Sequence, residues 1–190
     1  MDKPFIFDQL FEKQDFCTVP LAKGEYENCI FRGCRFSDAF LDNQNFMECT
    51  FEECDLTNAN ITHTIFKETF FKGCKLVGLR FEDCNDFLMS VRFEGCNLTL
   101  ASFNDLSLKE TPFIDCTLTQ TDFTGADLSR STFPGCTMEN TLFHTTNLEG
   151  ADLSSALGFD IDPSINTLKK CKFSKEGLIG LLKKYDIVVT

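Results

Sequence analysis

Several motifs that are common in enzymes and membrane proteins are missing from this sequence of 190 residues. It contains no run of 18 apolar residues, which a membrane-spanning helix needs. It contains no glycine-rich phosphate loop, no nucleophile elbow and no His-Glu-x-x-His motif. Carboxylates are plentiful, but nothing in their spacing indicates a pocket that would shift their pKa values. We therefore expect a protein that is not an enzyme, binds no cofactor and does not enter a membrane.

Metal-binding patterns are also absent. The sequence has 11 cysteines, but none form a Cys-x-x-Cys pair, and its two histidines, His63 and His144, are isolated. The first residues, Met-Asp-Lys-Pro-Phe-Ile-Phe-Asp, lack the basic and long apolar segments of a secretory signal. We expect a cytoplasmic protein whose thiols stay reduced and which has no metal site.

Positive charge is scarce. The 18 Lys and Arg residues stand against 29 Asp and Glu residues, which gives a net charge of −11. Because neutralising phosphates requires a basic surface, direct binding to nucleic acid is not expected. An acidic surface either keeps a protein soluble or attracts a basic partner.

What the sequence does contain is a repeat. Six Phe-x-x-Cys segments begin at Phe31, Phe51, Phe71, Phe93, Phe113 and Phe133, which we take as core residues. Each of these Phe residues follows the one before it by twenty positions, except that Phe93 follows Phe71 by twenty-two. This self-similarity predicts stacked supersecondary units. The longer step predicts a small insertion near residues 85–87 that loops out at a corner.

The twenty-residue unit divides into fives. Apolar residues occupy every fifth position from Phe11 to Phe81 and again from Leu88 to Leu153, and the residue two positions earlier is usually small. A period of five fits neither a helix nor a strand, and indicates a coil that turns a corner every five residues. Each of its four sides then points one large and one small side chain inward. Eight cysteines fall in the small position, where they would act as small apolar groups.

These motifs resemble the pentapeptide-repeat family. Residues 126–130 (Ala-Asp-Leu-Ser-Arg) and 151–155 (Ala-Asp-Leu-Ser-Ser) match its Ala-Asp/Asn-Leu-x-x consensus, and Cys54-Asp55-Leu56 matches it with Cys in place of Ala. The resemblance implies an all-β solenoid, a right-handed quadrilateral β-helix, over residues 11–156. The apolar positions correspond to about seven coils, or about 35 Å at roughly 4.8 Å per coil.

Both ends depart from the repeat. Residues 1–10 are a candidate N-terminal cap for the open coil edge. The register is lost from Leu157, so residues 157–190 are expected to form a C-terminal capping and dimerisation module. In that module we expect an α-helix from Ser174 and a short strand at 187–189. Its candidate dimerisation residues are Leu178, Leu181, Leu182, Tyr185 and Ile187.

The C-terminal segment points to one group within the pentapeptide-repeat family. The segment from Leu181 to Val189 is similar to the end of the Qnr group of pentapeptide-repeat proteins. Members of that group dimerise through their C-terminal modules, bind type II topoisomerases and protect them from quinolones. The resemblance implies a homodimer, joined tail to tail, that binds DNA gyrase or topoisomerase IV as a DNA mimic. Many Qnr proteins carry longer projecting loops needed for protection, whereas only two residues interrupt this repeat.

An acidic stripe is the candidate partner-binding site. Stepping through the sequence in twenties places seven carboxylates on two adjacent sides: Glu48, Glu52, Glu53, Glu68, Glu94, Glu110 and Asp115. The stripe is partial, because Lys67, Lys72, Arg92 and Lys109 interrupt it. Duplex DNA carries about 20 charges over 35 Å, roughly twice the net charge of this chain, so mimicry is feasible. Outward apolar residues such as Phe40, Phe70 and Phe87 favour a protein partner. The alternatives are an acidic surface that serves solubility alone and an interaction scaffold for another partner.

Overall fold

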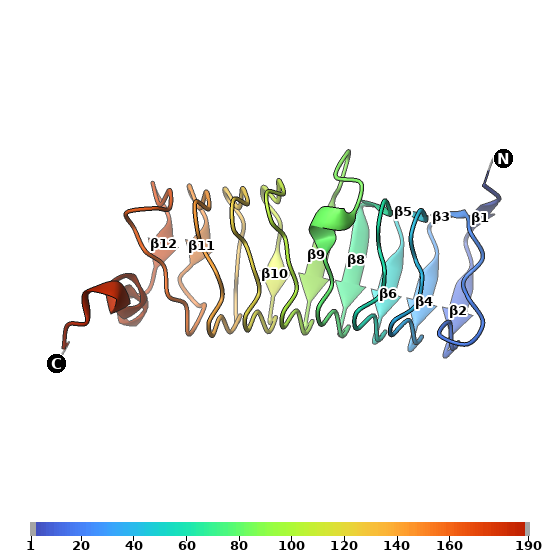
Figure 1. Cartoon of the computed structure of the whole chain (residues 1–190), viewed down its shortest axis with the longest axis horizontal. Coiled ribbons are helices and arrows are strands. Elements are labelled where there is room, and N and C mark those ends of the chain that lie inside the picture. The colour runs from blue at the N-terminus through green and yellow to red at the C-terminus, as the bar shows by residue number, and fades with distance from the viewer. Residues whose placement is uncertain (1–2, 189–190) are drawn as a thin grey trace.

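The computed structural model, which describes residues 3–188, is a rod in which the chain winds as a right-handed quadrilateral β-helix of about eight turns (Figure 1). Its strands are β1 (Phe5–Phe7), β2 (Leu10–Glu12), β3 (Glu25–Glu27), β4 (Ile30–Arg32), β5 (Asn45–Met47), β6 (Thr50–Glu52), β7 (Ile65–Lys67), β8 (Thr69–Lys72), β9 (Val91–Glu94), β10 (Phe113–Ile114), β11 (Asp152–Leu153) and β12 (Lys172–Phe173). Three short 3-10 helices accompany them: η1 (Phe81–Asp83), η2 (Glu176–Leu181) and η3 (Lys183–Tyr185).

Three parallel sheets run along the rod. Their strand orders are β1-β3-β5-β7, β2-β4-β6-β8-β9-β10 and β11-β12. Strand partners lie twenty positions apart in the sequence, as in Phe31↔Phe51 and Phe51↔Phe71, and twenty-two apart at Phe71↔Phe93. Isolated bridges with the same spacings connect successive turns elsewhere on the coil. The predicted fold class is confirmed.

The solenoid is longer at both ends than the sequence predicted, which accounts for eight turns rather than seven. β1 lies within the expected cap, yet it pairs in register with β3, so it belongs to the first turn. At the other end, Thr137↔Leu157 and Asp152↔Lys172 continue the step of twenty. The expected loss of register at Leu157 was therefore wrong. Gly158 and Pro163 replace two apolar residues of the pattern there, while the backbone pairing persists.

Phenylalanine rings fill the axis of the rod. The six repeat centres, Phe31, Phe51, Phe71, Phe93, Phe113 and Phe133, are all fully buried. Rings one turn apart are nearly parallel, with centroids 5.1 Å apart for Phe51 and Phe71 and 5.5 Å apart for Phe71 and Phe93. Rings on neighbouring sides meet edge to face, as Phe66 and Phe71 do at 5.4 Å. Burial stabilises the fold by about 1.5–3 kcal/mol for each such ring, and each aromatic pair adds about 0.5–1.5 kcal/mol.

The small inward positions supply hydrogen-bond donors as well as a good fit. The Cys54 thiol donates to the carbonyl oxygen of Phe31 at 3.2 Å, and the Thr121 hydroxyl donates to that of Leu98 at 2.8 Å. In both cases the acceptor lies 23 residues earlier, on the preceding turn, so the side chain ties two turns together. Burial raises the pKa of the Cys49 thiol to about 12, which keeps it protonated at neutral pH. These thiols are therefore more than the small apolar groups that the sequence predicted.

The corners follow from local backbone chemistry. Residues at the corners have positive φ, for example 52° at Glu53 and 61° at Gly73. The Asp or Asn of the repeat consensus stabilises the next turn, since the Asp127 carboxylate accepts a hydrogen bond from the Ser129 N–H at 3.0 Å. Asn and Asp favour such turns because their side chains reach the backbone two residues ahead. The five-residue consensus thus encodes one side and one corner.

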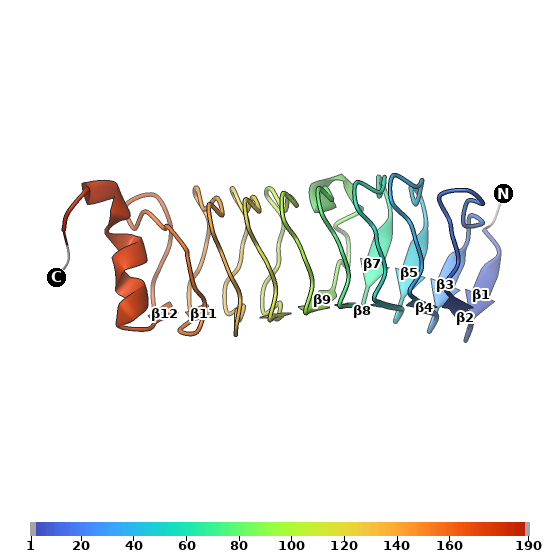
Figure 2. The same ribbon diagram turned by 90° about the horizontal axis from the view of Figure 1, so that it is seen from below.

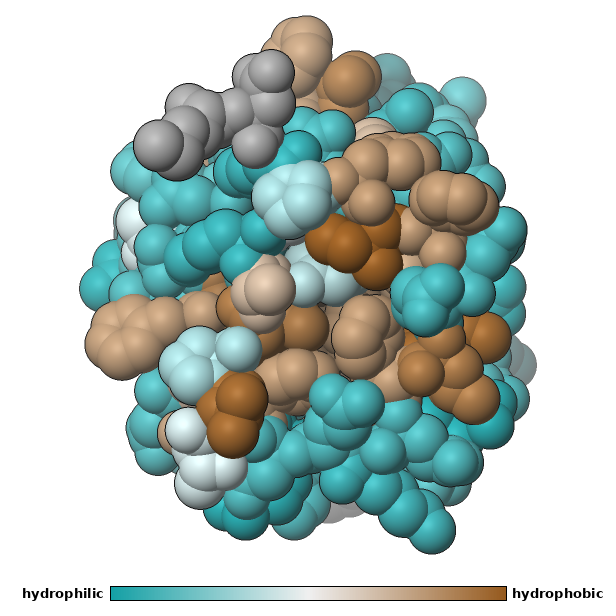
Figure 3. Space-filling model, turned by 90° about the vertical axis from the view of Figure 1, so that its right-hand side faces the viewer, coloured by the Kyte–Doolittle hydropathy of each residue, from teal (hydrophilic) through white to brown (hydrophobic). Residues whose placement is uncertain are grey.

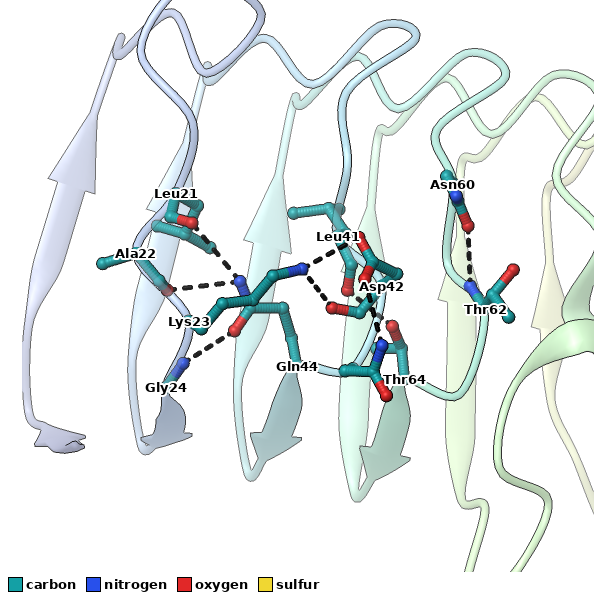
Figure 4. A network of polar contacts seen from close by, with 11 residues as sticks. Leu21, Ala22, Lys23, Gly24, Leu41, Asp42, Gln44, Asn60, Thr62 and Thr64 are labelled. Atoms are coloured by element: carbon teal, nitrogen blue, oxygen red, sulfur yellow. Dashed lines mark hydrogen bonds and ion pairs between the residues drawn. The ribbon is translucent and has the colours of Figure 1, made fainter. Parts of the chain in front are cut away.

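The second turn has no inward side chain at Gly24, and the side chain of Gln44 in the third turn takes its place. Gly24 occupies a small inward position, where an added Cβ would collide with the Ile6 side chain. Gln44, fully buried one turn later, accepts a hydrogen bond from the Gly24 N–H at 2.8 Å (Figure 4). Its amide nitrogen donates to the carbonyl oxygens of Leu21 and Ala22 at 3.4 and 3.2 Å. The buried amide is thereby satisfied at both ends.

The two-residue insertion forms a loop after η1 that projects from the rod (Figure 1). Hydrogen bonds from the Asn85 N–H to the Thr64 carbonyl and from the Ser90 N–H to the Phe66 carbonyl, both 3.0 Å long, bracket the loop. Leu88 was expected to point inward, which is wrong: it is 60% exposed and has a positive φ of 65°. Met89 packs against the core instead. The register resumes at β9.

The C-terminal segment lies across the end of the rod (Figure 2). It is helical as expected, but as two 3-10 helices, η2 and η3, rather than an α-helix. Gly180 of η2 is buried against Phe159, and its carbonyl oxygen accepts a hydrogen bond from the Ile161 N–H at 3.0 Å. Ile187 and Val188 form no strand, and Val189 lies outside the described residues. This segment therefore closes the C-terminal coil edge by packing.

Candidate protein-binding face

The predicted acidic stripe falls on one side of the rod. We call this side the six-stranded face, meaning the outward surface of sheet β2-β4-β6-β8-β9-β10 and its two corners. Glu52 and Glu94 lie on the strands β6 and β9. Glu48, Glu68 and Glu110 lie at the corner before these strands, and Glu53 and Asp115 at the corner after them. All five corner residues have positive φ, between 51° and 60°. The structure thus brings all seven carboxylates onto one face.

Charges on the strands of this face alternate in sign. In-register pairing places Glu12, Arg32, Glu52, Lys72 and Glu94 on five successive turns. Arg32 lies 2.7 Å from Glu52 and 4.0 Å from Glu12, and Lys72 lies 3.7 Å from Glu94. A parallel stack would otherwise set like charges side by side, which is destabilising. Each pair is half exposed to solvent, so its contribution to stability is small.

A second alternating column runs along the adjacent side. Asp15, Arg35, Asp55 and Lys75 occupy successive turns there. The Arg35 guanidinium lies 2.7 Å from the Asp15 carboxylate, and the Lys75 ammonium lies 3.7 Å from Asp55. Two neighbouring columns are therefore nearly neutral. This pairing was not foreseen, although the alternation can be read by stepping through the sequence in twenties.

The carboxylates that escape pairing are at the corners. Glu48, Glu68, Glu53 and Asp115 form no ion pair with any residue in the described part of the chain. Glu110, in contrast, lies 2.7 Å from the Arg130 guanidinium. Unpaired carboxylates therefore lie along both edges of the six-stranded face, with Lys67 beside one edge and Lys13 on the other, and a mixed surface lies between them.

A shallow groove of about 490 Å³ crosses this face. The corner glycines Gly73 and Gly95 leave it open, since neither carries a side chain. Its charged lining consists of Arg32, Glu52, Glu53, Lys72, Glu94 and Asp115. Four carboxylates against two cations give the groove a net negative charge, which suits a basic side chain from a partner.

Exposed apolar side chains do not form one patch. The exposed Leu10 and Ile30 and the half-buried Phe70 lie on the six-stranded face, where the Arg92 guanidinium covers the Phe70 ring at 4.7 Å from its centroid. Phe40 lies on a different side, where it bridges to Asn60, and Phe87 lies on the inserted loop. The apolar residues therefore support several small contacts rather than one hydrophobic interface.

Three of the predicted dimerisation residues are exposed to solvent, and the other two are half-buried. Leu178, Tyr185 and Ile187 are exposed, whereas Leu181 and Leu182 are half-buried and Leu181 packs against the core. Two further exposed apolar residues, Ile179 and Val188, lie in the same segment and were not predicted. The C-terminal end thus offers an apolar surface next to residues that hold it to the rod.

Sites for metals or membranes were also considered. Within residues 3–188, no three His, Cys, Asp or Glu side chains come together in a way that could hold a metal ion. No helix in that range has the length and apolar character needed to cross a membrane.

Comparison with known proteins settles the family. A model of the pentapeptide repeat region matches residues 44–113 and 86–178, which together cover most of the chain. The chain belongs to the pentapeptide repeat family. No sequence among the curated proteins matches it.

Solved structures share the architecture of this pentapeptide-repeat protein. A trypsin-treated form of QnrB1, described as a plasmid-mediated fluoroquinolone resistance protein, is 19% identical with a TM-score of 0.77, covering 100% of this chain and 95% of that one. Full-length QnrB1 is 18% identical with a TM-score of 0.58, covering 96% and 100%. HetL from Nostoc sp. strain PCC 7120, described as involved in heterocyst differentiation regulation, is 18% identical with a TM-score of 0.56, covering 89% and 85%. At these identities the similarity establishes the fold alone.

Proposed function

We propose that this protein is a non-catalytic, cytoplasmic binding protein that occupies the DNA-binding groove of a type II topoisomerase. The observation that carries the proposal is the gathering of seven carboxylates on the six-stranded face of a straight rod. The target groove is basic because it binds DNA, so an acidic rod of suitable width complements it. The fold shared with QnrB1 supports the choice of partner.

The arrangement of charge on this face supports mimicry of a duplex. Unpaired carboxylates follow the two corners, with Glu48 and Glu68 on one edge and Glu53 and Asp115 on the other. Two lines of negative charge beside a mixed surface resemble two phosphate strands beside a groove. The net charge of −11 over the rod is about half that of DNA over 35 Å. We therefore propose competition with DNA that weakens steeply as salt concentration rises.

A homodimer joined through the C-terminal ends would double the length of this surface. The exposed residues Leu178, Tyr185 and Ile187, with Leu181 and Leu182 beside them, are the proposed contact. Such a contact would also cover apolar surface that is open in the single chain. Opposed rods would then present one continuous acidic face to the enzyme.

The direct test is a supercoiling assay with purified DNA gyrase, run with and without a quinolone. The wild-type protein should inhibit supercoiling at micromolar concentration, and added DNA should relieve the inhibition. The variant Glu48→Lys/Glu68→Lys removes two unpaired carboxylates from one edge and should raise the inhibitory concentration at least about tenfold, which corresponds to one strong charge contact.

A matched control is Asp38→Lys/Asp105→Lys. Both residues lie at corners with positive φ, 56° and 58°, but away from the six-stranded face. The net charge change is the same, so this variant should inhibit like wild type if the face matters. Equal loss in both double variants would mean that total charge alone acts. An absence of both inhibition and drug protection by the wild-type protein would reject the topoisomerase proposal.

The second candidate is an interaction scaffold with a different partner. The alternating charge columns favour it, because they leave the strands of the six-stranded face and the adjacent side close to neutral. Affinity capture from a cell extract separates the two functions. Topoisomerase subunits as the dominant captured protein favour the first, and another dominant protein whose capture needs the same corner carboxylates favours the scaffold.

A further inference from the structure

The N-terminal end of the rod is apolar. Phe5, Phe7 and Leu10 are 53%, 57% and 53% exposed there, and the half-buried Ile6 and Phe11 of the same strands pack against the core. Seen end-on, hydrophobic residues gather in the middle of this end within a hydrophilic ring (Figure 3). The opposite end is covered by η2, whereas no helix among the described residues covers this one.

This end also carries backbone groups that bond to no neighbouring strand among the described residues, although the Phe7 carbonyl accepts a hydrogen bond from the Gln9 side-chain amide at 3.2 Å. β1 and β2 are the terminal strands of their sheets. The Pro4 carbonyl accepts a hydrogen bond from the Glu25 N–H at 2.9 Å, and the Asp8 N–H donates to the Glu27 carbonyl at 3.1 Å, so residues 4 and 8 face the second turn. Because alternate residues of a strand point their N–H and C=O groups in opposite directions, Phe5 and Phe7 direct theirs away from the rod.

We propose that this end docks against the same end of a second copy of the chain, with β1 antiparallel to β1 about a two-fold axis at Ile6. Phe5 of each copy then lies opposite Phe7 of the other, and the outward N–H and C=O groups of both residues are paired once the Gln9 side chain releases the Phe7 carbonyl. Cross-strand aromatic pairs stabilise such a contact. The strand edge and the apolar surface are therefore both self-complementary.

Charge at the rim fits the same arrangement. In this register Lys3 of one copy lies opposite Gln9 of the other and diagonal to Asp8, at both ends of the paired strands. Within one chain, neither residue forms an ion pair with any other described residue: Lys3 donates to the Asn45 side chain at 3.1 Å, and Asp8 accepts from Asn28 at 2.7 Å. The opposite signs favour an antiparallel second copy once the Lys3 and Asp8 side chains leave Asn45 and Asn28 and turn toward the end of the rod.

The test is analytical ultracentrifugation of the full chain over a wide range of concentration. Phe7→Asp should raise the dissociation constant of this contact about 30-fold, the effect of losing one central aromatic contact. Phe87→Asp, which changes a Phe that is 73% exposed on the inserted loop in the middle of the rod, is the control and should associate like wild type. Lys3→Glu and Asp8→Lys should each weaken association, and the double variant Lys3→Glu/Asp8→Lys should restore it.

The contact is independent of the proposed function and of the C-terminal contact. In a Tyr185→Asp/Ile187→Asp background a dimer should remain, and adding Phe7→Asp should give a monomer. A wild-type protein that sediments like Phe7→Asp at every concentration overturns the proposal. So does Phe7-dependent binding to neutral lipid vesicles without self-association, which would assign this end to a membrane surface.

Discussion

Truncation of Phe71 tests whether the aromatic column holds the rod together. The Phe71 ring is fully buried and has four aromatic neighbours: Phe51 at 5.1 Å, Phe93 at 5.5 Å, Phe66 at 5.4 Å and Phe81 at 6.3 Å. Phe71→Ala removes the ring from the middle of a rigid stack that cannot collapse around the cavity. The free energy of unfolding should fall by about 3–5 kcal/mol, as for other buried Phe truncations.

The expected shift in melting temperature follows from chain length. An unfolding entropy of about 2.1 cal/mol/K per residue gives about 0.4 kcal/mol/K for the chain, so Tm should fall by about 8–12 °C. Urea unfolding followed by circular dichroism gives the free energy directly. Because each turn contacts only its neighbours, the variant also tests whether the rod unfolds as one cooperative unit.

Two variants serve as controls for this measurement. Phe71→Leu keeps most of the apolar volume and should cost less than about 1.5 kcal/mol. Phe87→Ala truncates a ring that is 73% exposed and should change stability by less than about 0.5 kcal/mol. Our account of the core fails if Phe71→Ala leaves the urea midpoint unchanged, or if Phe87→Ala costs as much.

Three further predictions concern the bonds between turns and the C-terminal segment. Cys74→Ala should destabilise the protein by about 1 kcal/mol more than Cys74→Ser in urea unfolding, because serine retains a donor to the preceding turn; equal losses would contradict the role of the thiol as a donor. Gly180→Val should release η2, since an added Cβ would meet the Phe159 ring at 2.6 Å, and faster proteolysis of the tail would report it. The hydrogen bond from Lys184 lowers the pKa of Asp162 to about 2, so its stabilising effect is present above about pH 4 and is lost as pH falls toward 2; Asp162→Asn should flatten that part of the stability profile.

The repeat allowed much of the fold to be predicted, because each five-residue unit meets the same local demands. A large inward residue, a small inward residue and a corner recur in every unit. A wrong assignment of residues in one unit therefore does not affect the assignment of the next. The insertion was harder. A count of apolar residues placed Leu88 inward, whereas the loop occupies residues 85–89 and Leu88 lies on it. Periodicity locates an interrupted turn but does not say which residues inside it remain in register.

The ends were misjudged for a related reason. Gly158 and Pro163 break the apolar pattern, but backbone pairing between turns needs no particular side chain and continues to Phe173. The stripe was placed on the correct sides by stepping through the sequence in twenties, since vertical neighbours in this fold are fixed by that spacing. What sequence could not supply was the pairing state of each carboxylate, which depends on where Arg32 and Lys72 direct their charges.

A parallel, in-register stack repeats every outward position from turn to turn, and this constrains where a binding charge can be placed. A run of carboxylates along one strand position would bring like charges about 4.8 Å apart with no space to diverge. The observed columns avoid this by alternating sign, as Glu52 does between Arg32 and Lys72. At the corner after the strands, glycines separate the carboxylates, with Gly73 next to Glu53 and Gly135 next to Asp115, so these two can stay unpaired at lower cost. At the other corner Glu48 and Glu68 occupy successive turns, where side chains that point away from the sheet can diverge into solvent. The paired charges on the strands therefore stabilise the stack, and the unpaired carboxylates at the corners of the same face are free to bind a partner. Charge reversals at the corners should alter binding while leaving the solenoid folded.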